Sequence, residues 1–119
     1  YLGDLPGAAR DWLSDLELFF TRYQHWRGAA GCVEGAAYLA AERGEHACAA
    51  RFLASAARIR ELTGAPLMPQ WRKAQSAAEN KSREMLGAEF ERAQRAGASA
   101  RFEDVVAEAR ALLAAVAAA

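Results

Sequence analysis

Glycines and prolines divide this chain into segments that consist mainly of strong helix formers. Alanine, leucine, arginine and glutamate dominate between these breaks, and all four favour helices. Valine, isoleucine and threonine, which favour strands, are few and scattered. The sequence therefore predicts an all-α fold of about six helices without a sheet. The expected helices cover residues 5–23, 26–43, 45 or 46–62, 69–86, 88–96 and 102–113.

Residues with known capping roles mark the ends of these helices. Asp4 is expected to cap the first helix, because an aspartate side chain accepts hydrogen bonds from free backbone N–H groups. Gly44 and Gly64 are expected to end the second and third helices in the left-handed conformation that glycine adopts easily. Pro66 and Pro69 delay the next helix, since proline cannot continue a helix interior.

Charge and cysteine content argue against several classes of protein. Fifteen basic and fifteen acidic residues cancel, so no net positive field draws the chain to nucleic acid or to an anionic membrane surface. Cys32 and Cys48 form no C-x-x-C motif and lie in alanine-rich stretches, which indicates a reduced, cytoplasmic protein. No signal peptide is recognisable, and no apolar run approaches the roughly 20 residues of a membrane span. The chain begins at Tyr1 rather than at a methionine, so we expect a piece of a longer protein.

An internal repeat links two parts of the chain. Gly3-Asp4 and Ala8-Ala9-Arg10 realign with Gly44-Glu45 and Ala49-Ala50-Arg51 at an offset of 41 residues. A glycine, an acidic residue and a helix start with small side chains recur in the same order. Self-similarity at such a period is typical of stacked helix hairpins.

Residues 30–63 resemble a tetratricopeptide repeat. Small or apolar residues stand where the two antiparallel helices of that repeat pack closely, at Ala36, Ala37, Ala40, Gly44, Ala49, Leu53 and Ala56. The resemblance implies antiparallel helix hairpins in a divergent superhelix. It divides one domain into tetratricopeptide-like repeats at 1–64 and C-terminal capping helices at 65–119.

A longer series of motifs narrows this resemblance. Four short motifs follow one another within residues 28–113. They are Glu34-Gly35-Ala36-Ala37, Glu42-Arg43-Gly44-Glu45, Ala49-Ala50-Arg51-Phe52-Leu53 and Leu86-Gly87-Ala88-Glu89-Phe90. They resemble the tetratricopeptide-like C-terminal region of bacterial multidomain regulators, the large ATP-binding LuxR-type transcriptional and signal-transduction proteins. The resemblance implies a sensing, scaffolding or autoinhibitory module. The phosphate-binding motif G-x-x-x-x-G-K-[ST] of their ATPase part does not occur in this chain.

The resemblance assigns three residues to a partner-binding groove. Glu34, Tyr38 and Glu42 follow at successive i, i+4 steps, so they share one face of the second helix. Two carboxylates beside a tyrosine would suit a basic helix or peptide. The alternative interpretation is a solvated face with one tyrosine packed at its edge.

Large aromatic residues concentrate in the first quarter of the chain. Most are expected in the core, because burial of such rings dominates the stability of small domains. A subset would face a neighbouring helix or domain, since an internal repeat unit needs neighbours on both sides. We therefore expect Trp12, Phe20 or Tyr23 to mediate contact with another domain or self-association.

The sequence predicts no catalytic residue, metal site or cofactor. His25 fits a partly exposed turn, and the H-x-C pair of His46 and Cys48 lacks the further ligands of a tetrahedral zinc site. Arg58, Arg60 and Glu61 could bind a phosphate or carboxylate, but their spacing also fits a half-exposed helix.

These observations lead to a non-enzymatic binding function. The leading interpretation is a protein-interaction or regulatory helical-repeat module of a multidomain bacterial regulator, whose partner is a protein, a peptide or another domain of the parent chain. The alternative is a small-molecule effector domain in which aromatic residues between helices enclose a ligand. A helical enzyme fragment is disfavoured, because no nucleophile and base and no metal-ligand set stands out.

Overall fold

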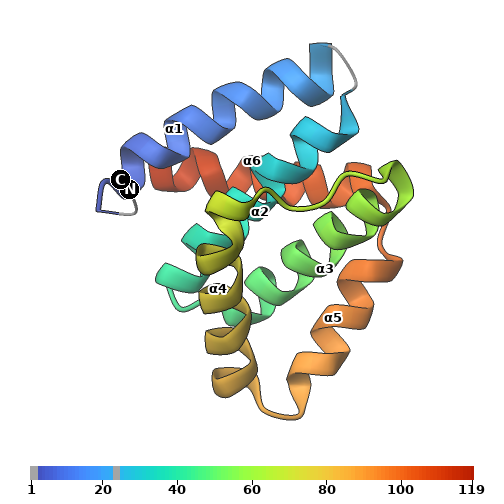
Figure 1. Ribbon diagram of the computed structural model, residues 1–119. Coiled ribbons are helices and arrows are strands. Elements are labelled where there is room, and N and C mark those ends of the chain that lie inside the picture. The colour runs from blue at the N-terminus through green and yellow to red at the C-terminus, as the bar shows by residue number, and fades with distance from the viewer. Residues whose placement is uncertain (1–2, 23–24) are drawn as a thin grey trace.

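The computed structural model describes residues 3–22 and 25–119 of the chain. Six α-helices and no strand are found among these residues, so the prediction of an all-α fold is confirmed (Figure 1). The helices are α1 (Leu5–Leu16), α2 (Trp26–Glu42), α3 (His46–Thr63), α4 (Arg72–Leu86), α5 (Glu89–Ser99) and α6 (Phe102–Ala117). A π-helical turn, η1 (Glu17–Arg22), continues α1, and a short 3-10 turn, η2 (Pro69–Trp71), precedes α4.

Helix ends follow the capping residues that the sequence indicates. The Asp4 side chain accepts a hydrogen bond from the Gly7 N–H at 3.0 Å and so caps α1. Gly64 directly follows α3 and Gly44 lies two residues after the end of α2, and they adopt positive φ angles of 69° and 80°, respectively. A positive φ turns the chain out of the helix, and glycine adopts it without strain because it carries no Cβ.

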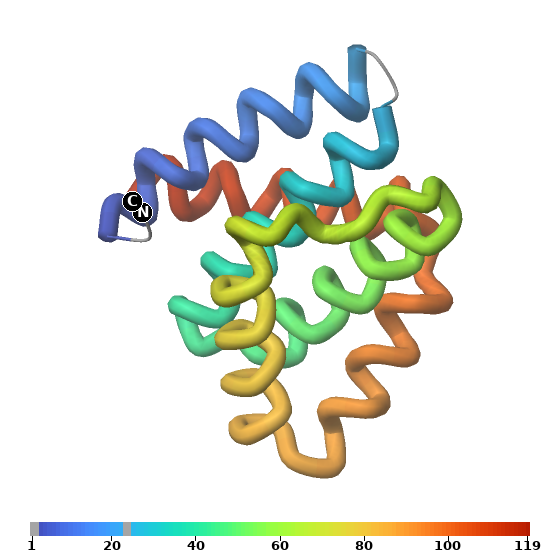
Figure 2. Tube along the Cα trace, in the orientation of Figure 1, coloured from blue at the N-terminus to red at the C-terminus, as the bar shows by residue number. Residues whose placement is uncertain are grey.

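The last helix returns to the first one. Figures 1 and 2 show α6 lying along α1 in the opposite direction, so that the end of α6 comes near the start of α1. Arg110 of α6 forms an ion pair with Glu17 and donates a hydrogen bond to the Thr21 hydroxyl at 3.0 Å. An open repeat stack has contacts between neighbouring units only. The bundle is instead closed, which the expected superhelix did not include.

One core joins both halves of the chain. Leu16, Leu39, Phe52 and Leu113 are among its fully buried side chains and come from α1, α2, α3 and α6. α6 extends to Ala117, beyond the end expected at residue 113. Burial of Val116 stabilises the last turn, because tertiary packing supplies most of a helix's stability. No described helix combines the length and apolarity that crossing a membrane requires.

α5 approaches α3 closely at one glycine. A Cβ atom placed on Gly97 would lie 2.1 Å from the carbonyl oxygen of Arg51. That oxygen belongs to the backbone of α3, so it cannot move aside as a flexible side chain would. Only glycine therefore permits this contact between the two helices.

Gly97→Ala is expected to lower the free energy of unfolding by about 1–3 kcal/mol, because the added methyl group forces α5 away from α3. Gly31→Ala is the matched control. Its Cβ would meet only the Arg60 guanidinium, at 3.9 Å, and alanine favours a helix by up to about 1 kcal/mol over glycine. Urea unfolding followed by circular dichroism measures both variants. Equal effects of the two substitutions would contradict the close contact.

Candidate functional site

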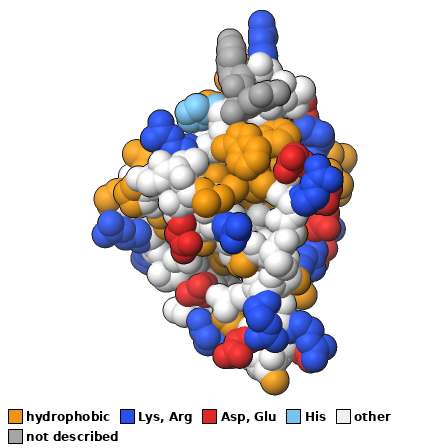
Figure 3. All heavy atoms as spheres, turned by 90° about the vertical axis from the view of Figure 1, so that its right-hand side faces the viewer, with side chains coloured by type: hydrophobic (Ala, Val, Ile, Leu, Met, Phe, Trp, Pro, Cys, Tyr) orange, Lys and Arg blue, Asp and Glu red, His pale blue; other side chains and the backbone are white. Residues whose placement is uncertain are grey.

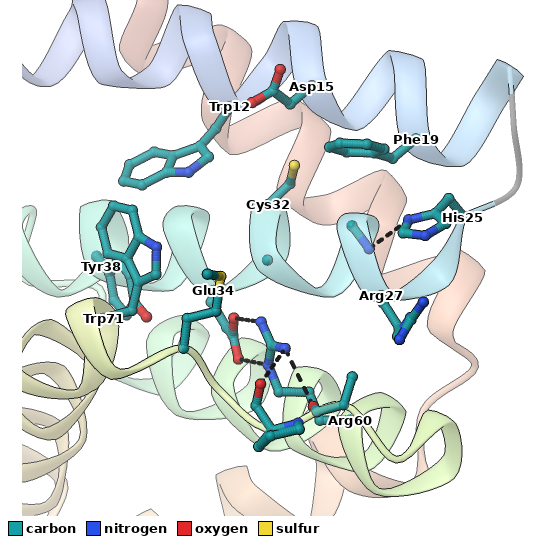
Figure 4. Close-up of a pocket in the computed structure, with 15 residues that line it drawn as sticks. Trp12, Asp15, Phe19, His25, Arg27, Cys32, Glu34, Tyr38, Arg60 and Trp71 are labelled. Carbon is teal, nitrogen blue, oxygen red and sulfur yellow. Dashed lines mark hydrogen bonds and ion pairs between the residues drawn. The ribbon is translucent and has the colours of Figure 1, made fainter.

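A cleft of ≈ 440 Å³ lies between α1, α2, the end of α3 and the segment 64–71. This segment joins α3 to α4 and crosses the front of the molecule in the view of Figure 2. Figure 4 shows Trp12, Tyr38 and Trp71 at one end of the cleft, whereas Phe19, His25 and Arg27 lie towards the other. Glu34 and Arg60 lie between them.

Glu34 and Arg60 form a bidentate ion pair at the floor of the cleft. The Nη2 and Nε atoms of Arg60 donate to the two carboxylate oxygens of Glu34 at 2.6 and 2.7 Å. The Glu34 side chain is only 7% exposed and the Arg60 side chain only 16%. The hydrogen bond with Glu34 raises the pKa of Arg60, which keeps the guanidinium charged.

Arg60 also binds the segment that follows α3. Its Nη1 atom donates to the carbonyl oxygens of Ala65 and Pro66, both at 3.4 Å. One guanidinium therefore connects α2, α3 and the segment 64–71. These bonds use most of its N–H donors, and its charge is paired with Glu34, so Arg60 is poorly suited to bind an anion.

Three aromatic rings from three different elements meet at one end of the cleft. The ring centroids of Tyr38 and Trp71 are 6.0 Å apart and the rings are stacked. Trp12 meets both rings at steep angles, with its centroid 6.2 Å from Tyr38 and 6.0 Å from Trp71. Trp12 and Tyr38 are buried, whereas Trp71 is partly exposed. We call these three residues the aromatic corner.

The Tyr38 hydroxyl is buried and has no hydrogen-bond partner among the described residues. Burial, together with the charge of Glu34, raises the pKa of Tyr38 well above its ordinary value. The phenol is therefore neutral at physiological pH and can donate a hydrogen bond. A buried polar group without a protein partner is uncommon.

Burial keeps both cysteine thiols in the protonated form at neutral pH. Burial, with smaller contributions from Asp15 and Glu34, raises the pKa of the Cys32 thiol to about 12. Burial also raises the pKa of Cys48 to about 11. Since the thiolate is the reactive form, both side chains act as small apolar groups at neutral pH.

The structure corrects the expected groove of Glu34, Tyr38 and Glu42. Glu34 and Tyr38 are buried and only Glu42 is exposed, so the three do not form one open face. Arg60 covers Glu34, and Trp71 stacks on Tyr38. Glu34 and Tyr38 instead line the cleft, while Tyr38 and Glu42 line a second hollow of ≈ 390 Å³ against α4.

The expected interface aromatics separate into different environments. Trp12 is buried in the aromatic corner, which corrects its expected role at an interface, and Tyr23 lies outside the described residues. Phe20 packs against Trp26 and Phe102, with ring centroids 6.4 and 6.0 Å away. We call Phe20, Trp26 and Phe102 the aromatic patch. Trp26 is its most exposed member, at 38%, and Figure 3 shows apolar side chains gathered on this side of the molecule.

The remaining polar candidates do not converge on a site. His25 is exposed, and its Nδ1 atom accepts a hydrogen bond from the Gly28 N–H at 3.1 Å, which caps α2. Arg58 and Glu61 point away from the protein while Arg60 turns inward. Among the residues that the structure describes, no three or more His, Cys, Asp or Glu side chains gather as metal ligands would.

Comparison with protein-family models, with curated proteins and with solved structures finds no match for this chain. The resemblance to the C-terminal region of LuxR-type regulators therefore stays a prediction.

Breaking the Glu34–Arg60 pair is expected to destabilise the fold. Glu34→Gln or Arg60→Met should each lower the free energy of unfolding by about 2–3 kcal/mol, because a largely buried charge loses its partner. The double variant should lose less than the sum of the two, since the interaction is already absent in each single variant.

Arg95→Met is the control, because its ion pair with Glu91 is long and the Arg95 side chain is 73% exposed. It should change stability by less than about 0.5 kcal/mol. Chemical denaturation of all four variants measures these energies. Strictly additive losses would mean that the pair contributes no coupling.

Proposed function

We propose that this chain is a non-catalytic binding module that holds a small molecule in the cleft between α1, α2 and the segment 64–71. The observation that carries the proposal is the aromatic corner, which stands in a cleft of ≈ 440 Å³ beside a buried hydroxyl without a protein partner. Small-molecule sites are typically clefts of about 300–1,000 Å³ with apolar walls and a few placed polar groups.

The chemistry of the cleft favours binding over catalysis. Glu34 and Arg60 neutralise each other, and the Cys32 thiol stays protonated. The Nδ1 atom of His25 is engaged in capping α2. A general base needs a free lone pair and a nucleophile within hydrogen-bond reach, and these groups do not supply that arrangement.

The position of the cleft suggests how binding would be transmitted. The segment 64–71 forms one wall and leads directly into α4. A ligand that contacts Trp71 would bind one position of this segment better than others and so shift its population. Such a response fits the sensing role implied by the resemblance to bacterial multidomain regulators.

The aromatic patch supports a second candidate function, contact with another protein or with another domain of a parent chain. Trp26 is exposed while Phe20 and Phe102 pack beneath and beside it. Exposed tryptophans are enriched at the centres of protein interfaces. The patch comes from η1, α2 and α6, and neither Trp26 nor Phe102 lines the cleft.

A pair of matched variants separates the two candidates. A metabolite that binds the cleft should raise the melting temperature of the wild type and of Trp26→Leu, but not of Trp71→Leu, which lacks one ring of the aromatic corner. Thermal-shift screening against a small-molecule library measures this. A partner that docks on the patch would show the opposite dependence. Stabilisation retained in Trp71→Leu and lost in Trp26→Leu would refute the proposed cleft function.

A further inference from the structure

Gly31 is the place where the cleft reaches the backbone of α2. It lines the cleft and is the middle one of three glycines of α2, Gly28, Gly31 and Gly35. Their spacing of three and four residues puts them on one face of the helix. Because glycine has no Cβ atom, a flat group can contact the helix backbone directly at such a position. The groups that cover these glycines therefore show which shapes this face accepts.

Aromatic rings from the preceding elements cover the two outer glycines. A Cβ atom on Gly28 would lie only 2.6 Å from the Phe19 ring, and one on Gly35 would overlap the Trp12 indole. Each ring is thus close enough to α2 that only glycine leaves room for it. This face of α2 accepts flat aromatic groups at both positions.

The middle glycine has no such cover. Among the described residues, a Cβ atom on Gly31 would meet only the Nη2 atom of Arg60, at 3.9 Å. In Figure 4, Trp12 and Phe19 lie at separate positions along the α1 side of the cleft, and Arg60 lies opposite them. The cleft of ≈ 440 Å³ therefore has room at Gly31 for a group from outside the chain.

The neighbouring guanidinium makes an aromatic ring the favoured occupant. Arg60 is charged and fixed in place by its pair with Glu34. A guanidinium attracts the electron-rich face of an aromatic ring and stacks on it, whereas it gains little from a saturated ring. A saturated ring is also thicker, because its atoms do not lie in one plane. It therefore makes fewer close contacts with the backbone at Gly31.

We infer that the cleft recognises its ligand through a planar aromatic ring that lies against Gly31 beside the Arg60 guanidinium, an inference that rests on the proposed binding function of the cleft. The ring takes at Gly31 the place that Phe19 and Trp12 take at the two outer glycines. The rest of the ligand extends towards Trp71, which lines the same cleft.

The alcohols phenylpropanol and cyclohexylpropanol test this inference directly. Both are neutral and carry the same chain, so they differ only in the ring. Burial of apolar area alone favours the cyclohexyl compound, which has the larger and more apolar ring. The inference predicts the reverse order, with phenylpropanol binding at least about threefold more tightly. Titration of amide chemical shifts by nuclear magnetic resonance measures both dissociation constants.

Glycine variants locate the ring. Gly31→Ala places a methyl group where the ring is expected and should weaken phenylpropanol binding about fivefold or more. This variant keeps its fold, because the space over Gly31 is open and alanine favours the helix. Gly31→Leu should abolish the binding of both alcohols. Gly3→Ala is the matched control and should bind as the wild type does, since Gly3 does not line the cleft and has open space around it.

Three results would overturn the inference and leave the proposed binding function standing. Equal or tighter binding of cyclohexylpropanol would show that the cleft accepts apolar groups of any shape. Unchanged phenylpropanol binding in Gly31→Ala would place the ring elsewhere. Absence of binding by both alcohols, while a library ligand stabilises the wild type and not Trp71→Leu, would remove the ring. If no compound acts through Trp71 either, both proposals fail together.

Discussion

The bidentate contact between Glu34 and Arg60 determines how the cleft is arranged. It joins α2 to α3 across 26 residues of sequence, and the same guanidinium draws in the start of the segment 64–71. A buried ion pair gains little over an apolar pair of equal size, but an unpaired buried charge is costly. The pair therefore favours one arrangement of these elements over its alternatives, and that arrangement brings Trp71 onto Tyr38.

The surrounding helices give this contact a stable base. Most side chains of α2 are buried, and many are alanines, which allow neighbouring helices to approach closely. α6 closes the bundle by returning to α1, through burial of Leu113 and Val116 and through the contacts of Arg110. The floor of the cleft is thus part of the core, whereas the wall formed by residues 64–71 has no helix or strand until η2 begins at Pro69. The proposed ligand would act on this wall, because it is less constrained by packing.

Local features of the sequence predicted the helices well and the site poorly. Helix boundaries depend on nearby residues such as Asp4, Gly44 and Gly64, whose capping roles need no tertiary partner. Glu34 was expected at the surface, since its i, i+4 relation to Tyr38 and Glu42 is all that the sequence displays. Its burial depends on Arg60, and the stacking of Tyr38 depends on Trp71. Neither contact is indicated by residues that are close together in the sequence. The closed bundle was missed for the same reason, because the packing of α6 on α1 joins opposite ends of the chain.

The indole N–H signals of the three tryptophans in a nuclear magnetic resonance spectrum test the central claim most directly. If the Glu34–Arg60 pair positions the segment 64–71, Glu34→Gln should shift the Trp71 and Trp12 signals, which report on the aromatic corner. The Trp26 signal, on the aromatic patch, should stay in place. An unchanged Trp71 signal in a folded Glu34→Gln variant would contradict the account, because the segment would then hold its position without the pair.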